Sequence, residues 1–373
     1  RRSGGAGAKE EGALSLPLGS AIEVPHHRSG ASYLILAQVP AELAEEFYAA
    51  LEREAGAPAA RRDEFKLAWL PLIDAVVSAR FSVEALRLLG SVDYRLLVAV
   101  ERGMINHEYV SLELIASLAG VGGELAERRM RRLHALGLVQ RVKAAYTGYV
   151  LTSRGYDCLA FRVLAKRGVL EAISQSPVGE GKESEVYLGL TPGGRLVAVK
   201  VHRVGRTSFR SVKKVRLYAA GKRHTSWLYQ SRLAARSEYE ALRLLWKAGV
   251  SVPEPIDWNR HVVVTGYVEG VELSEGPELE DPGSVLERAL AEVEKAYRAG
   301  VVHGDLSEYN VLVVEGEKVV LIDWPQWVSS SHPQALTLLK RDVENLAAFF
   351  ARKYGLKLNA AALAEEFLTR VAG

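Results

Sequence analysis

The chain has 373 residues, of which 48% are hydrophobic and 25% charged, so it is long enough for two or three globular domains with real cores. The formal net charge of +3 is too small to attract nucleic acid through the overall field, so any such binding must depend on local basic patches. The single cysteine, Cys158, excludes an internal disulfide framework and favours a reducing, cytoplasmic setting, and no apolar run is long enough to cross a membrane.

The first 80 residues are treated as an N-terminal extension without an assigned role. Residues 1–30 are rich in Gly, Ala, Ser and Pro and show no apolar period, which predicts a disordered tail. A strand is expected over residues 32–39, followed by helices over 40–54 and 63–79.

Residues 81–168 predict a winged helix-turn-helix domain. Three helices are expected and then a short hairpin, which is the element order of that fold. The expected helices are 82–101 (interrupted near Gly90), 111–119 and 124–136, and the expected strands are 138–144 and 149–151. Thr152 is placed to cap a linking helix over 153–166.

Basic side chains gather on the third helix and the hairpin of this domain. They are Arg128, Arg129, Arg131 and Arg132 on the helix, with Arg141 and Lys143 on the hairpin. Such a recognition helix and wing are suited to phosphate backbones. The alternative is a solvated basic face on a domain that docks to protein.

Residues 169–373 predict a second, larger domain. A strand-rich half comes first, with strands over 186–190, 196–202, 254–258 and 261–267 and one long helix over 232–248. The remainder is mostly helical, with two short strands at 311–314 and 319–322. The chain as a whole is therefore expected to be of the α+β class, with a winged helix followed by a bilobal domain.

A glycine-rich turn and a strand lysine in the first half are typical of phosphate binding. Gly179, Gly181, Lys182 and Ser184 lie between two strand-like segments, where glycines let backbone N–H groups approach phosphate oxygens. Lys200 ends the run Val-Ala-Val-Lys, which matches the strand lysine that neutralises nucleotide phosphates in protein kinases. Glu238 on the following helix is the favoured partner of Lys200, with Glu240 facing away.

The strongest motif is the run from His303 to Asn310, His-Gly-Asp-Leu-Ser-Glu-Tyr-Asn. An aspartate with an asparagine five residues later matches the kinase catalytic loop, so Asp305 would face the acceptor and Asn310 a metal ion. Asp323 ends a strand thirteen residues further on, at the place of the metal-binding aspartate of kinases. Together with Lys200, these residues predict a protein-kinase-like fold and an ATP site with Mg²⁺ or Mn²⁺.

The departures from ordinary protein kinases are also informative. Gly304 precedes Asp305 where kinases carry an arginine, and Pro325 replaces the glycine that follows the metal aspartate. About fifty residues follow Asp323 and contain no Ala-Pro-Glu motif. The C-terminal lobe is therefore expected to be truncated, without the peptide-binding half.

The segments Gly-Glu-Gly-Lys-Glu-Ser, His-Gly-Asp-Leu-Ser-Glu-Tyr-Asn and Ile-Asp-Trp-Pro-Gln together resemble the RIO family of atypical kinases, and the winged helix resembles its type-two subfamily. The resemblance implies that Lys200 and Ser184 contact phosphates, that Asp305 is catalytic, and that Asn310 and Asp323 bind metal. It implies a hinge for adenine at Gly266 to Val268 and a transient phospho-aspartate at Asp323. It also implies maturation of the small ribosomal subunit, with its precursor and rRNA as partners.

A long stretch without acidic residues is consistent with an rRNA contact. From Lys200 to Arg236 there are eleven Lys or Arg and no Asp or Glu, and Arg206, Lys213 and Lys214 are candidate RNA contacts within it. The alternative for this stretch is a disordered, solvated loop. Two alternatives for the whole chain are a small-molecule kinase of the aminoglycoside-phosphotransferase type, which shares the catalytic motifs, and an idle RNA-binding scaffold.

Overall fold

The computed structural model describes residues 22–25, 32–35, 88–143, 146–174, 176–204 and 223–372. The expected helices over 40–54 and 63–79 lie outside these residues, as do Arg206, Lys213 and Lys214. Within the described ranges no helix is long and apolar enough to span a membrane.

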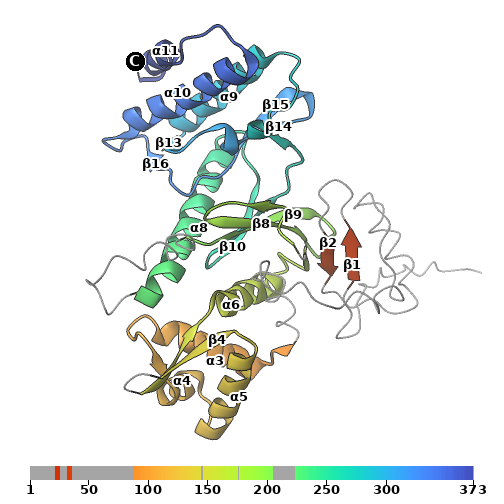
Figure 1. The fold of residues 1–373 in the computed structure, drawn as a ribbon, viewed down its shortest axis with the longest axis vertical. Helices are drawn as coiled ribbons and strands as arrows, with labels where there is room; N and C mark the ends of the chain where they lie inside the picture. The colour runs from red at the N-terminus through yellow and green to blue at the C-terminus, as the bar shows by residue number, and fades with distance from the viewer. Residues whose placement is uncertain are drawn as a thin grey trace, which may run out of the picture.

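The winged-helix domain occupies the lower part of Figure 1 and has the predicted element order. Its helices are α3 (Ser91–Gly103), α4 (Leu112–Ala119) and α5 (Gly123–Ala135), and its sheet has the strand order β3 (Val110–Ser111), β5 (Thr147–Leu151), β4 (Val139–Lys143). The interruption expected near Gly90 is the start of α3, where the Asp93 carboxylate accepts a hydrogen bond from the Gly90 N–H at 2.9 Å. Strand β3 was not predicted, because two residues are too few to show a period.

Helix α6 (Ser153–Lys166) joins the two domains over the predicted residues. Thr152 caps it as expected, since its hydroxyl accepts a hydrogen bond from the Gly155 N–H at 3.2 Å. Every residue from Gly155 to Phe161 is buried, which fits the place of α6 between the winged helix and the sheet that follows.

The first lobe of the second domain is an eight-stranded sheet with the path β1-β2-β6-β8-β9-β11-β10, and β7 pairs with β8 off this path. The strands are β1 (Ile22–Pro25), β2 (Ser32–Ile35), β6 (Ala172–Ser174), β7 (Gly179–Glu180), β8 (Ser184–Leu190), β9 (Leu196–His202), β10 (Pro255–Asn259) and β11 (Val262–Gly266). All pairings are antiparallel, and Lys200 on β9 lies opposite Val186 on β8 and Val263 on β11. The lysine is thus carried on a central strand with a neighbour on each side.

The expectation that residues 1–30 are disordered is wrong for β1. Strand β1 pairs with β2, and β2 pairs with β6, so this hairpin extends the sheet of the first lobe. Four residues give no measurable period, and the partner that makes β1 a strand is itself short. Sequence composition alone therefore missed it.

The C-terminal lobe is short and mainly helical, as predicted. Its helices are α9 (Pro282–Arg298), α10 (Ala335–Tyr354) and α11 (Ala360–Ala372), and its strands are β12 (Val271–Glu272), β13 (Val301–Val302), β14 (Val311–Val314), β15 (Lys318–Leu321) and β16 (Val328–Ser329). Short 3₁₀ turns occur at Leu273–Glu275, Glu308–Asn310 and Glu315–Glu317. These elements share one apolar core, which includes the fully buried Phe350 and Trp324.

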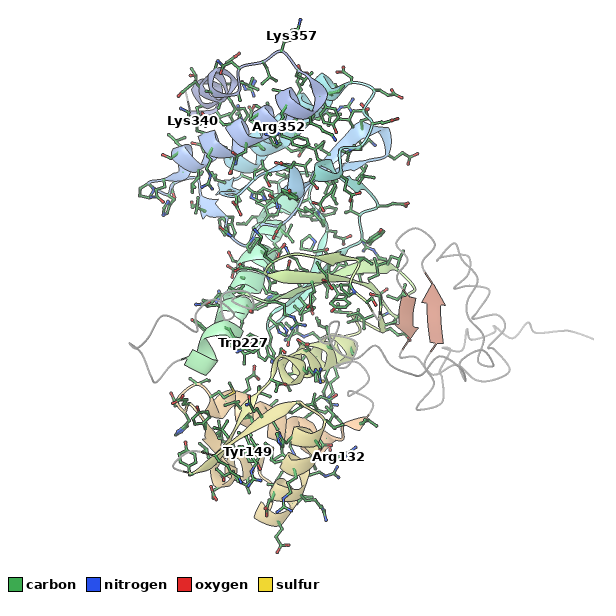
Figure 2. The ribbon with its side chains drawn as sticks, in the orientation of Figure 1. Arg132, Tyr149, Trp227, Lys340, Arg352 and Lys357 are labelled. Carbon is green, nitrogen blue, oxygen red and sulfur yellow. The ribbon has the colours of Figure 1, made fainter. Side chains whose placement is uncertain are left out.

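Helix α8 (Arg223–Lys247) is longer than predicted and takes part in two cores. Leu228, near its beginning, is buried in the core of the winged helix, where Trp227 packs as well. Leu242 and Leu245, near its end, are buried in the core of the C-terminal lobe. Figure 2 shows Trp227 where α8 meets the winged-helix domain.

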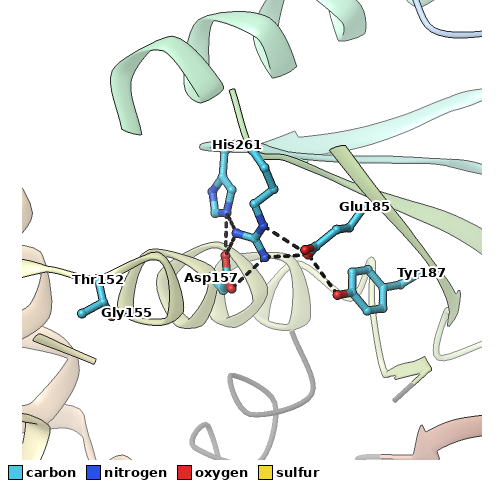
Figure 3. Close-up of polar contacts among 7 residues, drawn as sticks. Thr152, Gly155, Asp157, Glu185, Tyr187 and His261 are labelled. Atoms are coloured by element: carbon cyan, nitrogen blue, oxygen red, sulfur yellow. Dashed lines mark hydrogen bonds and ion pairs between the residues drawn. The ribbon is translucent and has the colours of Figure 1, made fainter. Parts of the chain in front are cut away.

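A buried polar group, here called the Arg203 cluster, fastens α6 to the sheet (Figure 3). It consists of Asp157, Glu185, Tyr187, Arg203 and His261. The Arg203 guanidinium donates to both oxygens of Asp157, at 2.6 and 3.1 Å, and to Glu185 at 3.2 Å. His261 bonds to Asp157 at 2.7 Å, and the Tyr187 hydroxyl donates to Glu185 at 3.0 Å. Because Arg203 directly follows β9, the linking helix is tied to the strand that carries Lys200.

Candidate active site

Lys200 and Glu238 form the ion pair that the sequence predicted. The Lys200 ammonium lies 2.8 Å from Glu238, and Glu240 points outward to an exposed pair with Arg236. Burial opposes ionisation of Glu238, but the charge of Lys200 and the hydrogen bond from His202 outweigh it and lower the pKa of Glu238 to about 2. The pair is therefore ionised, and it fixes β9 against α8.

Asp323 lies on the other side of the same ammonium group. Its Oδ1 is 2.5 Å from the Lys200 Nζ, so one lysine joins the two lobes. Burial alone would lower the pKa of Lys200, but the neighbouring carboxylates Glu238 and Asp323 raise it above its ordinary value. Asp323 has a φ of 67°, a left-handed backbone conformation that is uncommon outside glycine and typical of functional positions.

The strand pair β14 and β15 brings Asn310 next to Asp323. Val311 pairs with Leu321, and the Ile322 N–H donates to the Asn310 carbonyl at 2.9 Å. The Asn310 side-chain oxygen accepts hydrogen bonds from the Ser307 N–H and hydroxyl, both at 3.1 Å. Asn310 therefore caps the catalytic turn, and its metal role remains a prediction.

Asp342 on α10 is a functional residue that the sequence analysis missed. Its two oxygens accept hydrogen bonds from the Gly304 N–H at 2.7 Å and the Leu306 N–H at 3.0 Å, so it holds the backbone on both sides of Asp305. Burial raises the pKa of Asp342 to about 6, although the two backbone donors stabilise its charged form. Asp305 itself is exposed, and its role toward the acceptor stays a prediction.

His303 connects the loop that carries Asp305 to the segment that carries Asp323. Its Nε2 is 3.0 Å from the Ile322 carbonyl, and its ring packs against Trp324 at 4.5 Å between centroids. Burial lowers the pKa of His303, so the ring is neutral and donates this hydrogen bond. This contact joins His303, two residues before Asp305, to Ile322, the residue directly before Asp323.

The glycine-rich turn leads into β8. Its last residue, Ser184, lies two positions before Val186, which pairs with Lys200 on β9. Gly179 is in β7, the Gly181 N–H donates to the Ser184 carbonyl at 2.9 Å, and Lys182 is exposed. Gly266 is the last residue of β11 and pairs with Val197, three positions beyond Val263, which pairs with Lys200. Val268 lies two residues after Gly266. The phosphate role of the turn and the hinge role of Gly266 to Val268 stay predictions.

The basic residues of the winged helix divide into two groups. Arg129 and Arg132 are engaged with the protein: both approach the buried Asp93, at 3.5 and 3.9 Å, and Arg132, although exposed, also donates to the Leu88 carbonyl. Arg128 and Arg131 are exposed, and Arg131 pairs along the helix with Glu127. Arg141 and Lys143 on β4 are exposed as well.

The oxygen donors at this site suit a hard divalent cation. In the described part of the chain, Asp323 Oδ2 accepts no hydrogen bond, and its side chain is 42% exposed. This oxygen is a carboxylate ligand of the kind that Mg²⁺ prefers, whereas the side-chain oxygen of Asn310 already accepts two hydrogen bonds from Ser307. Within the described residues, no group of three or more His, Cys, Asp or Glu forms a preassembled metal site.

Comparison with known families agrees with this architecture. The model of the RIO domain matches residues 185–363, and the model of the Rio2 N-terminal domain matches residues 86–167. The chain is 43% identical over 256 residues to the RIO-type serine/threonine-protein kinase Rio2 of Methanocaldococcus jannaschii, covering 67% of this chain and 93% of that protein. It is 42% identical over 277 residues to the serine/threonine-protein kinase RIO2 of Caenorhabditis elegans, covering 74% of this chain and 52% of the relative.

Solved structures give the same result. The Rio2 kinase from Chaetomium thermophilum, in an ADP/Mg²⁺-phosphoaspartate complex, has a TM-score of 0.67 and 32% identity, and the match covers 78% of this chain and 93% of that one. The chain spans about half the length of the Caenorhabditis relative and nearly all of the Methanocaldococcus one. With both family models in the order that the fold shows, the chain belongs to the RIO family of kinases, in its Rio2 branch.

Proposed function

We propose that this protein is an ATP-dependent phosphotransferase or ATPase that acts in maturation of the small ribosomal subunit. The observation that carries the catalytic part is the triad Glu238, Lys200 and Asp323, with distances of 2.8 and 2.5 Å. In nucleotide phosphoryl transfer, a paired lysine neutralises the phosphates while the carboxylate of the second lobe holds the metal ion. Asp323 and Asn310 are the residues that would hold Mg²⁺, which would neutralise charge on the phosphate oxygens.

Asp323 is also placed to accept the phosphoryl group. A carboxylate near the γ-phosphate is a possible nucleophile, and the shortened C-terminal lobe offers no peptide acceptor that would compete. In the proposed step an Asp323 oxygen forms a bond to the γ-phosphorus as the bond to the bridging oxygen breaks, and ADP leaves with the electron pair. Water then hydrolyses the acyl phosphate and restores Asp323. The Chaetomium Rio2 complex contains a phosphoaspartate, which supports the same chemistry here.

The partners follow from the family and from the distribution of charge. The precursor of the small ribosomal subunit and its rRNA are the proposed partners, with the winged helix and the acid-free stretch from Lys200 to Arg236 as contacts. Exposed Arg128, Arg131 and Arg141 provide cationic groups on one domain. ATP turnover measured with and without purified small-subunit rRNA tests this partner.

The covalent step has a direct test. The protein is incubated with γ-labelled ATP, quenched in acid and treated with hydroxylamine, which cleaves acyl phosphates and spares phosphoserine and phosphothreonine. Label should be lost on treatment and absent from Asp323→Asn. The control is Asp281→Asn, since Asp281 caps α9 far from the triad in sequence and asparagine caps helices equally well. Label that resists hydroxylamine would exclude the phospho-aspartate.

A further inference from the structure

A cavity of about 560 Å³ lies between the winged helix and the first lobe, apart from the residues of the active site. Its walls come from the end of α3, the beginning and end of α6, the first half of α8 and the turn between β10 and β11. The residues that matter for its chemistry are Arg102, Ile105, Tyr156, Tyr229, Arg232 and Trp258. This volume is within the range of small-ligand pockets.

Two ion pairs hold the walls in place. Arg260 on the β10–β11 turn donates to Glu101 on α3 at 2.6 and 2.8 Å, which joins the two domains across the cavity. Arg167 at the end of α6 donates to Asp257 at 2.9 and 3.0 Å. These pairs neutralise two of the four arginines and make the cavity a preformed feature.

The other two arginines carry uncompensated charge. Arg102 and Arg232 are exposed, and among the described residues neither has a carboxylate within 4 Å. Residues 227–236 of α8 include no Asp or Glu, so no acidic side chain of that wall offsets them. The cavity is therefore positive and open to an anionic ligand.

Aromatic faces accompany this charge. The Tyr229 side chain is 57% exposed on α8, one helical turn from Arg232. Trp258 on β10 lines the opposite wall and is partly buried, since it also packs against Tyr239. A tyrosine exposed to that extent contributes little to the core, so its ring face is accessible to a ligand beside Arg232. Arginine charge beside aromatic faces is the combination that recognises single-stranded nucleic acid.

We propose that this cavity binds one unpaired nucleotide of a single-stranded RNA segment. The base stacks on Tyr229 or Trp258, and the adjoining phosphate contacts Arg102 and Arg232. An acidic peptide would match the charge but would leave the aromatic faces unused. The inference rests on the RNA contact proposed above, yet it concerns a different surface from α5 and from the triad.

Binding is measured with a fluorescein-labelled 12-nucleotide single-stranded RNA that contains 4-thiouridine, in the presence of saturating ADP to fill the ATP site. Arg102→Ala/Arg232→Ala should lower affinity and reduce the log–log salt slope by about 1.4, from roughly 0.7 for each lost phosphate contact. Tyr229→Ala should weaken binding by about fivefold or more, whereas Tyr229→Phe keeps the stacking face and binds normally. Photo-crosslinks should map to peptides containing Tyr229 or Trp258.

The matched control is Lys247→Ala/Lys357→Ala, which removes two exposed charges outside the cavity and should leave the slope unchanged. Thermal unfolding of every variant shows whether the fold is retained. Normal RNA binding by Arg102→Ala/Arg232→Ala, or crosslinks that map elsewhere, would overturn the proposal while leaving the proposed ATPase intact. Binding of free AMP or of a polyglutamate peptide that depends on these arginines, without RNA binding, would overturn it as well.

Discussion

The Arg203 cluster provides a quantitative test of how the two domains are joined. Arg203→Met removes the cation from two buried carboxylates, Asp157 and Glu185, whereas Asp157→Leu leaves Arg203 still paired with Glu185. Breaking a buried ion pair by removing one partner costs roughly 3–5 kcal/mol. Asp157→Leu is therefore expected to lower the free energy of unfolding by about 3 kcal/mol, the lower end of this range. Arg203→Met should lower it by about 5 kcal/mol, the upper end.

The pH dependence of the same cluster has a definite sign. Burial disfavours the Asp157 anion, but the charge of Arg203 and the bond to His261 outweigh it, so the pKa of Asp157 is held well below its ordinary value. A carboxyl whose pKa is depressed on folding stabilises the folded state above its unfolded pKa, and this contribution is lost as the pH falls. Wild type should therefore lose stability below about pH 4, and Asp157→Leu should lose less over the same interval.

The assay is urea unfolding followed by circular dichroism at pH 7, with the free energy of unfolding compared between variants. Arg236→Met is the control, because it breaks the exposed pair with Glu240 and should cost no more than about 0.5 kcal/mol. The triple variant Asp157→Leu/Glu185→Gln/Arg203→Met should recover most of the loss, since no buried charge remains unpaired. If the free energy of unfolding of Arg203→Met is within about 1 kcal/mol of the wild-type value, the Arg203 cluster does not stabilise the junction between the domains.

Three further outcomes are expected at the active site and on the winged helix. Asp305→Ala should abolish phosphoryl transfer and leave ATP affinity within about threefold, because the exposed carboxylate serves the acceptor side; a collapse in measured ATP affinity would show that the role is wrong. Asp342→Asn should lower kcat by about tenfold, since an amide offers one acceptor oxygen to two N–H donors. It should also remove the acidic limb that titration of Asp342 is expected to give wild-type turnover near pH 6. As the pKa of Asp342 is raised on folding, its contribution to stability is lost as the pH rises through 6, so stability and turnover should change in opposite directions in a pH series. Arg128→Ala/Arg131→Ala should reduce the salt slope of RNA binding by about 1.4 without a change in melting temperature, and an unchanged slope would indicate a protein-docking wing.

The sequence predicted the elements whose residues repeat with a clear period or carry a cap. Helix α6 and strand β9 have the predicted bounds, and the Lys200–Glu238 pair was chosen correctly over Glu240. These succeed because local pattern and motif spacing each specify the structure without knowledge of distant partners. The motifs also assigned Lys200 and Asp323 to one ATP site, and the structure brings the two side chains within 2.5 Å of each other.

What was missed depends on contacts between distant parts of the chain. Asp342 lies with Leu339, Val343 and Leu346 on the buried face of α10, so an acid at a core position of an amphipathic helix was the available signal. Strand β1 and the first turns of α8 contain no comparable sequence signal. Strand β1 depends on its pairing with β2, and the start of α8 depends on its packing in the winged-helix core. Asp157 offered the same kind of signal as Asp342, because it is an acid within the buried stripe of α6.

The two-core packing of α8 means that the border between the family models does not divide the molecule into separable parts. A chain cut at residue 169 would keep α8 but lose the winged-helix core around Leu228, leaving that side chain and Trp227 in water. Fully burying such side chains is worth roughly 1.5–3 kcal/mol each, and their exposure favours self-association. The kinase part is therefore expected to be stable and soluble only when it is produced together with its winged helix, and exchange of winged helices between relatives would require matching changes at the start of α8.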